Sequence, residues 1–177
     1  MTNYKPILQE CAMRYGTGMG LLWTFKFMLF PLGLRIPFLQ LLFIILTLGV
    51  PILGYLFAKN FRERYCDGSI AFTRAFLFTT FMYMFASILV AVTHYIYFRY
   101  IDDGFVFHIY RSLLEQLKNT TEVGLAAPLE QLEEAIDLLA ALTPLEITFQ
   151  LISQNMFYGM LMAIPTALVV MRKKKIQ

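Results

Sequence analysis

Few residues in this sequence are of the kinds that build catalytic or metal sites. There are two cysteines and two histidines among 177 residues, and none of them falls in an HExxH or CxxC pattern. A Gly-rich phosphate loop and a Gly-x-Ser-x-Gly turn are absent as well. We therefore expect no catalytic residues, no cofactor and no bound metal, and a protein that is not an enzyme.

Charged residues are also scarce, and where they are missing the sequence is apolar over long stretches. They make up 15% of the chain, against about 25% in a typical soluble domain. Four apolar segments stand out, at residues 13–33, 36–58, 70–98 and 147–171. Each is near or above the roughly 20 residues that a helix needs to cross about 30 Å of hydrocarbon. The sequence thus predicts an all-α, polytopic membrane protein with four transmembrane helices.

Local sequence features bear on whether the first segment is a span and on where the last one begins. A secretory signal peptide could explain the first, but Lys26 lies inside it and no small-x-small cleavage site follows, so we expect it to remain as a span. The last is preceded by Thr143 as a helix cap, Pro144 in the first turn and Glu146 three residues after the cap. The fourth span is therefore predicted to cover residues 144–171.

The charges that are present fall unevenly about the four spans. Basic residues collect on one side: Lys5, Arg14, Lys59, Arg62, Arg64 and the run 172–175. Nine acids collect on the other: Asp102, Asp103, Glu115, Glu122, Glu130, Glu133, Glu134, Asp137 and Glu146. Because short positive segments stay in the cytoplasm, we expect both termini to be cytoplasmic and the segment between the third and fourth spans to be exterior. The basic tail, residues 172–177, then contacts lipid headgroups, and no nucleic-acid partner is expected.

This topology also assigns the cysteines and histidines to compartments. Cys11 and Cys66 fall on the cytoplasmic side, where thiols are kept reduced, so no structural disulfide is expected. His94 and His108 fall on the exterior side. We interpret them as ordinary interface residues in preference to a metal site with the neighbouring Asp102 or Asp103.

Residues 104–142, between the third and fourth spans, have an amphipathic pattern. Apolar residues recur at helical spacing in two stretches that Gly124 separates: Ile109, Tyr110, Leu113, Leu114 and Leu117, then Leu129, Leu132, Ile136 and Leu139. Neither stretch is basic, which disfavours attraction to anionic lipid. We predict an exterior helical hairpin whose apolar faces meet each other, the bundle or a partner protein.

Several polar residues fall inside the predicted spans and form a candidate polar layer: Lys26, Gln40, Glu146, Gln150, Gln154 and Tyr158. The last four are spaced four apart on one helix face, and such a stripe should point into the bundle or into a cavity. One interpretation is interhelical hydrogen bonding, and the other is a substrate path. Lys26 either joins this layer in a small pocket or extends its stem outward to the headgroups.

Two further sets of residues are candidates for contacts. Lys59, Arg62 and Arg64, in the segment after the second span, and Arg74, one turn into the third, form a candidate cytoplasmic contact surface for a partner. Gly16 and Gly20 lie four apart on the first span, a spacing that lets two helices approach closely, within the chain or in an oligomer. Pro51 predicts a bend in the second span.

The third span begins with a recognisable motif. It reads Gly-x-Ile-x-Phe-x-x-Ala-Phe over Gly68 to Phe76, follows the basic segment Lys59 to Arg64, and leads into a long span that ends in aromatic residues. With four spans, an acidic helical insert and a basic tail, the chain resembles the DUF4199 family of bacterial, chiefly Bacteroidetes, membrane proteins over most of its length. The resemblance implies an inner-membrane protein with no catalytic residues to carry over. It also implies a candidate partner, a family 2, polyprenyl-phosphate-type glycosyltransferase, because genes for such enzymes often lie beside genes of the family.

The sequence therefore favours a non-enzymatic membrane subunit that anchors or organises a partner protein at the cytoplasmic face. The alternative is a small transporter or lipid-binding protein that uses the layer around Lys26 and Gln154. A dry, packed interior would favour the subunit, and a paired, water-reaching cavity would favour the alternative.

Overall fold

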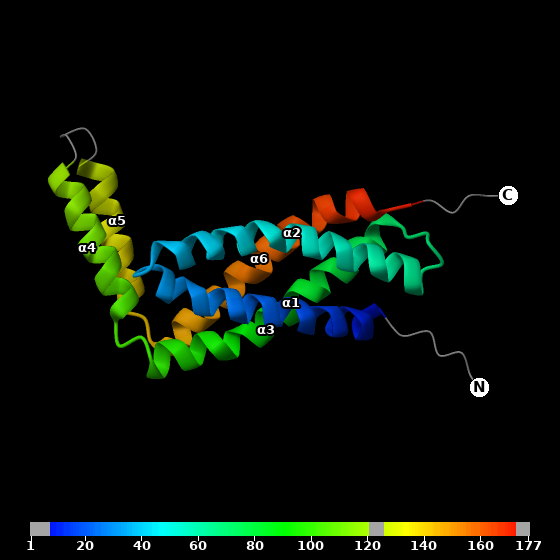
Figure 1. Cartoon of the computed structure of the whole chain (residues 1–177), viewed down its shortest axis with the longest axis horizontal. Coiled ribbons are helices and arrows are strands. Elements are labelled where there is room, and N and C mark those ends of the chain that lie inside the picture. Colours follow the sequence, from blue (N-terminus) through cyan, green and yellow to red (C-terminus); the bar gives the residue numbers. More distant parts are fainter. Residues whose placement is uncertain (1–7, 121–125, 173–177) are drawn as a thin grey trace. The chain divides into compact units, whose positions relative to one another are not determined.

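The computed structural model describes residues 8–120 and 126–172. Over these ranges the chain forms six helices (Figure 1): α1 (Leu8–Gly33), α2 (Pro37–Tyr65), α3 (Phe72–Tyr100), α4 (Phe105–Thr120), α5 (Ala126–Ala140) and α6 (Pro144–Val170). The prediction of an all-α chain is confirmed. Lys5, Glu122, Gly124 and the tail beyond Arg172, all used in the sequence analysis, lie outside the described residues.

Two of the helices have the length and composition of membrane spans by themselves. These are α2 and α3, each of 29 residues, and α5 with α6 qualifies as a third span only if the pair is taken as one bent element. Long apolar helices of this kind suggest a membrane protein. Composition therefore does not identify all four of the spans predicted from the sequence. The hydropathy of α1 is lowered by Lys26 and three closely spaced glycines, and that of α6 by its polar residues.

The helix ends follow local sequence signals. The predicted start of α6 is confirmed: the Thr143 backbone N–H donates to Glu146 Oε2 at 2.7 Å, and the Glu146 N–H donates back to Thr143 Oγ1 at 3.3 Å. Helix α2, in contrast, continues through Lys59, Arg62 and Arg64 to Tyr65. These basic residues therefore lie in the last two turns of α2, and not in a separate segment after the second span, since Lys and Arg are good helix formers.

The described residues form two compact units. The first comprises residues 8–92 and 151–172 and the second comprises residues 93–120 and 126–150. In the first unit, α1, α2 and the included parts of α3 and α6 surround one core (Figure 1), whose largest fully buried side chains include Tyr83, Phe61 and Phe78. Half of the apolar stretch of α3 is buried, against 17% of that of α2. Helix α3 is therefore the central element of this unit.

Glycines let the other helices approach α3 closely. A Cβ at Gly16 would lie 2.8 Å from the Met82 carbonyl oxygen, and one at Gly20 would lie 2.7 Å from a Leu89 methyl group. Both glycines are buried inside the unit. Gly16 and Gly20 thus pack α1 against α3 of the same chain, which leaves them inaccessible to a second copy.

In the second unit, α4 and α5 are joined by ion pairs. Arg111 donates two hydrogen bonds to Asp137 Oδ1, at 2.8 and 3.0 Å, and Lys118 pairs with Glu133. Asp102 caps α4 by accepting the Val106 N–H at 3.2 Å. Among the apolar residues, Leu114 and Ile136 are buried, whereas four that the sequence placed on the apolar faces are exposed: Leu113, Leu117, Leu132 and Leu139. The buried seam of the hairpin, which includes Leu114 and Ile136, is therefore narrower than the apolar stripes of the sequence.

This seam yields a prediction for the helical hairpin. Ile136→Asp is expected to make α4 and α5 separate, because an unpaired carboxylate on a side chain that is 8% exposed costs several kcal/mol to bury. Leu132→Asp is the matched control one turn away, because Leu132 is 47% exposed. Limited proteolysis of both variants checks this. Equal resistance of the two variants would show that Ile136 does not hold the hairpin together.

Candidate functional site

Lys26 of the predicted polar layer lies against aromatic rings. Its Nζ is 5.4 Å from the centroid of Phe43 on α2 and 6.0 Å from the ring of Trp23 on α1. A cation over an aromatic face is stabilised electrostatically, by about 2 kcal/mol when desolvated. Within the described residues, no hydrogen bond or ion pair joins Lys26 to Gln40, Gln154 or Tyr158. The predicted polar pocket is therefore not formed around Lys26.

Gln40 packs against Gly33 at the turn between α1 and α2. In the part of the chain that the structure describes, its Oε1 is buried and has no hydrogen-bond partner. This oxygen lies 2.7 Å from where a Cβ on Gly33 would be. The absence of a side chain at Gly33 thus leaves room for Gln40 at the point where the chain reverses between the two helices.

The polar stripe on α6 faces outward, so the prediction that it points into the bundle is wrong. In the first unit Gln154 is exposed and Tyr158 is 57% exposed, and in the second unit Glu146 and Gln150 are exposed as well. The reason is a competing face of small residues four apart, which are buried: Gly159, Ala163 and Ala167. Small residues at this spacing take the packed side of a membrane helix, and this signal was missed.

Tyr83 of α3 shows why α6 turns its small residues inward. The ring stacks on Trp23 of α1, with centroids 5.8 Å apart, and its hydroxyl oxygen occupies the place of a side chain at Gly54 of α2. From α6, a Cβ at Gly159 would lie 2.6 Å from Tyr83 Cβ. One large side chain thus contacts three neighbouring helices, and two glycines make room for it.

The candidate cytoplasmic contact residues lie in different environments. Arg64 and Arg74 are exposed and Lys59 is half-buried, whereas Arg62 is only 3% exposed. Arg62 Nη1 donates to the Val170 carbonyl oxygen at 2.9 Å, and Nη2 donates to Glu63 Oε1 at 3.0 Å. Arg62 therefore caps the C-terminal end of α6, where a cation is favoured, and cannot belong to an exposed contact surface.

The family motif builds the turn beside this cap. Asp67 and Gly68 have φ of 50° and 75°, a left-handed conformation that allows the chain to reverse after α2. Ile70 then pairs with Arg172 in an antiparallel bridge, with both backbone hydrogen bonds at 3.0 Å. Ile70 and Ala75 are buried. The motif thus fastens the α2–α3 turn to the end of α6, which is a structural role.

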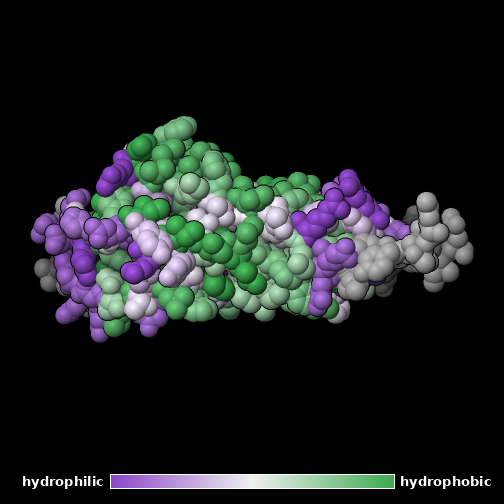
Figure 2. Space-filling view, turned by 90° about the horizontal axis from the view of Figure 1, so that it is seen from below, coloured by the Kyte–Doolittle hydropathy of each residue, from purple (hydrophilic) through white to green (hydrophobic). Residues whose placement is uncertain are grey.

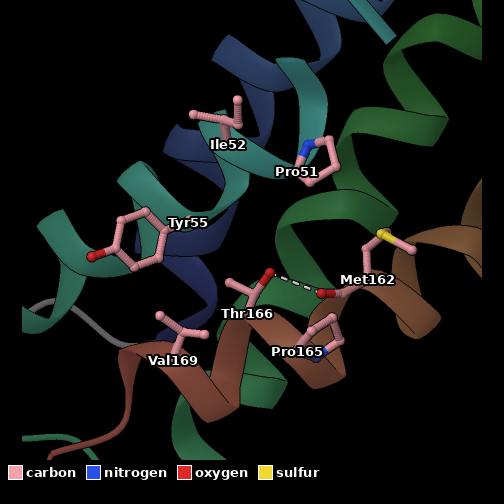
Figure 3. Close-up of a pocket in the computed structure, with 7 residues that line it drawn as sticks. All are labelled: Pro51, Ile52, Tyr55, Met162, Pro165, Thr166 and Val169. Atoms are coloured by element: carbon pink, nitrogen blue, oxygen red, sulfur yellow. Dashed lines mark hydrogen bonds between the residues drawn. The ribbon is translucent and has the colours of Figure 1, made fainter. Parts of the chain in front are cut away.

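An apolar groove runs between α2 and α6 in the first unit. Its volume is about 330 Å³, and it is lined by Pro51, Ile52, Tyr55, Met162, Pro165, Thr166 and Val169 (Figure 3). The Thr166 hydroxyl donates to the Met162 carbonyl oxygen at 2.8 Å, so its polar group is satisfied within the helix. Each wall contains a proline, the residue that most often bends a helix. Pro51, where the sequence predicts a bend, is one of the residues that line this groove.

The surface of the first unit is mostly apolar. Exposed large hydrophobic residues occur on α1, α2 and α6, among them Leu21, Phe38 and Leu168, and Figure 2 shows hydrophobic residues along the length of this face. Exposed basic residues of the first unit include Arg64, near the end of α2, and Arg172, just after α6. No group of three or more His, Cys, Asp or Glu residues that could hold a metal occurs in the part of the chain that the structure describes.

These observations define an all-α protein with long apolar helices of the kind found in membranes. The chain belongs to the DUF4199 family, described as proteins of unknown function, whose sequence profile matches residues 14–172. The resemblance in the motif and the basic segment is thereby confirmed. Neither the curated proteins nor the solved structures contain a match.

Proposed function

We propose that this protein is a non-enzymatic, four-span subunit of the bacterial inner membrane that anchors or organises a partner protein. The observation that carries the proposal is the outward-facing polar stripe of α6, with Gln154 exposed and Tyr158 57% exposed. In hydrocarbon, such groups must be paired. Within residues 8–120 and 126–172, no side chain is hydrogen-bonded to Gln154 or Tyr158, so a helix of another protein can supply the hydrogen bonds.

The packing of the helices supports the proposal of four spans, although composition by itself identifies fewer. Helices α1 and α6 have 26 and 27 residues, and about 20 residues suffice to span. Both pack on α3, which is apolar enough to span by itself. Both also expose large apolar side chains such as Phe25 and Ile164, and lipid covers such residues better than water does. These features support a bundle in which α1, α2, α3 and α6 cross together.

The interior favours the subunit over a transporter built on Lys26 and Gln154. Lys26 lies against aromatic rings, and Gln154 is on the outer surface. Tyr83 and Phe78, at 1% and 0% exposure, fill the centre of the unit. A close-packed centre filled by aromatic side chains supports a role in assembly over a role in transport.

The first candidate partner is the polyprenyl-phosphate-type glycosyltransferase that the family resemblance implies. Purification of the tagged protein from its native membranes in mild detergent, followed by mass spectrometry, tests this. We expect a membrane glycosyltransferase to be recovered in near-equal amount. Recovery of the protein in quantity without any membrane partner would contradict the subunit role.

The proposed topology predicts where introduced cysteines react. In a background with Cys11 and Cys66 replaced by alanine, a membrane-impermeant maleimide should label Asn119→Cys from outside intact spheroplasts and should leave Arg64→Cys unlabelled. Both positions are exposed. The native cysteines are less suitable, since both are buried and burial raises the pKa of the Cys11 thiol. Labelling of Arg64→Cys alone would invert the topology.

A further inference from the structure

We propose that the apolar groove between α2 and α6 holds an acyl chain of an anionic phospholipid of the cytoplasmic leaflet, with Lys59 beside the phosphate. The inference rests on the proposed topology, because α6 must lie in the membrane for lipid to reach the groove. It goes beyond the partner-binding role, which uses the polar stripe of α6.

The lining of the groove selects hydrocarbon. Six of the seven side chains are aliphatic, thioether or aromatic, and the hydroxyl of the seventh, Thr166, is bonded to the Met162 carbonyl oxygen. Figure 3 shows Pro51 and Ile52 on one wall and Pro165 and Val169 on the other, with the Tyr55 hydroxyl directed away from Pro51. Water in such a groove finds no open hydrogen-bond partner, so a lipid chain fills it better.

The groove leads toward positive charge along α2. Lys59 follows Tyr55 by four residues and Ile52 by seven, so it lies on the groove face of α2. The distance from Pro51 to Lys59 along the helix is about 12 Å, at about 1.5 Å per residue. This length fits within the roughly 15 Å that one leaflet contributes to the hydrocarbon core. A phosphate at Lys59 would therefore place its acyl chain alongside Tyr55 and Pro51.

The other wall ends in positive charge as well. Arg172 follows Val169 of the groove by three residues, is exposed, and has its backbone fixed by the bridge to Ile70. Between the two walls, the buried Arg62 guanidinium caps α6, and its Nε has no hydrogen-bond partner among the described residues. Glu63, the acid nearest in sequence, is already paired with Arg62. The charge at this end of the groove is thus complementary to an anionic headgroup.

Native mass spectrometry of the full chain released from nanodiscs tests the site. The nanodiscs contain phosphatidylcholine with or without phosphatidylglycerol, and the readout is the lipid that stays bound. We expect preferential retention of phosphatidylglycerol. Lys59→Gln should reduce that preference about fivefold, which corresponds to the ~1 kcal/mol of one cation at a membrane surface. Arg64→Gln is the matched control, because Arg64 is five residues further on and faces another side of α2.

A second pair of variants tests the chain-binding part. Ile52→Trp fills the groove and should lower the retention of both lipids, whereas Ile44→Trp, at an exposed position of α2 outside the groove, should behave as the parent. Equal effects of Lys59→Gln and Arg64→Gln, or unchanged retention in Ile52→Trp, would overturn the proposal. The proposal would also be overturned if Ile52→Trp retained the lipid as the parent does but lost a bound protein partner. Cysteine labelling run in parallel separates failure of this site from failure of the topology.

Discussion

Gly159→Ala is expected to lower the melting temperature by roughly 3–10 °C, whereas Gly49→Ala should leave it unchanged or raise it. A Cβ at Gly159 would lie 2.6 Å from Tyr83 Cβ, so α6 or Tyr83 must shift. Overpacking of this kind costs about 1–3 kcal/mol, and each kcal/mol lowers the melting temperature by about 2–4 °C in a chain of this length. At Gly49 an added Cβ meets nothing within 4 Å, and alanine is the better helix former by up to about 1 kcal/mol.

The chain contains its own probe for this measurement. Trp23 is the single tryptophan and stacks on Tyr83, so its fluorescence reports directly on the packing that Gly159→Ala disturbs. Thermal unfolding is followed in detergent for the parent and both variants. Gly159→Leu should fail to fold. A Gly159→Ala protein as stable as Gly49→Ala would show that α6 does not pack on Tyr83 as described.

Replacing the polar stripe is expected to separate the protein from its partner while leaving it folded. Gln154→Leu with Tyr158→Phe removes two of the four exposed polar groups of the stripe and makes α6 more apolar, so membrane insertion should not suffer. Two interhelical hydrogen bonds are worth about 0.6–2 kcal/mol each, which corresponds to a loss of association of about tenfold or more.

The measurement is the amount of partner recovered per amount of tagged protein, with the Trp23 fluorescence melt as a check on folding. The control is Met160→Leu with Ile164→Val, two conservative changes at exposed apolar positions of the same helix. Unchanged recovery with the stripe variant would show that these polar groups face lipid or water, and the proposed contact on α6 would have to be abandoned.

The hydropathy pattern predicted the helices well because it reflects which segments leave water. The start of α6 could also be predicted, because Thr143 and Glu146 form their hydrogen bonds within four residues. Such local interactions are fixed by sequence spacing. The left-handed conformation of Gly68 is local in the same sense, because it belongs to the turn itself.

The orientation of side chains within the bundle could not be predicted in the same way. The sequence placed Arg62 at the surface because Arg is usually exposed, but its partner, the Val170 carbonyl, is 108 residues away. The sequence analysis also predicted that Gln154 faces inward, because polar groups avoid lipid. The inward face is instead formed by Gly159, Ala163 and Ala167, since close helix approach needs small residues. Both errors arose where distant parts of the chain compete for one packed surface.

The most direct test of the proposed subunit role is photo-crosslinking in living cells from a single position on the polar stripe. A photoreactive amino acid at Gln154 is compared with one at Leu168, an exposed apolar position of the same helix. If a partner covers the stripe, Gln154 gives one discrete protein adduct, which contains the partner, and Leu168 gives mainly lipid adducts. Lipid adducts alone at both positions would contradict the proposal that this protein binds a partner through α6.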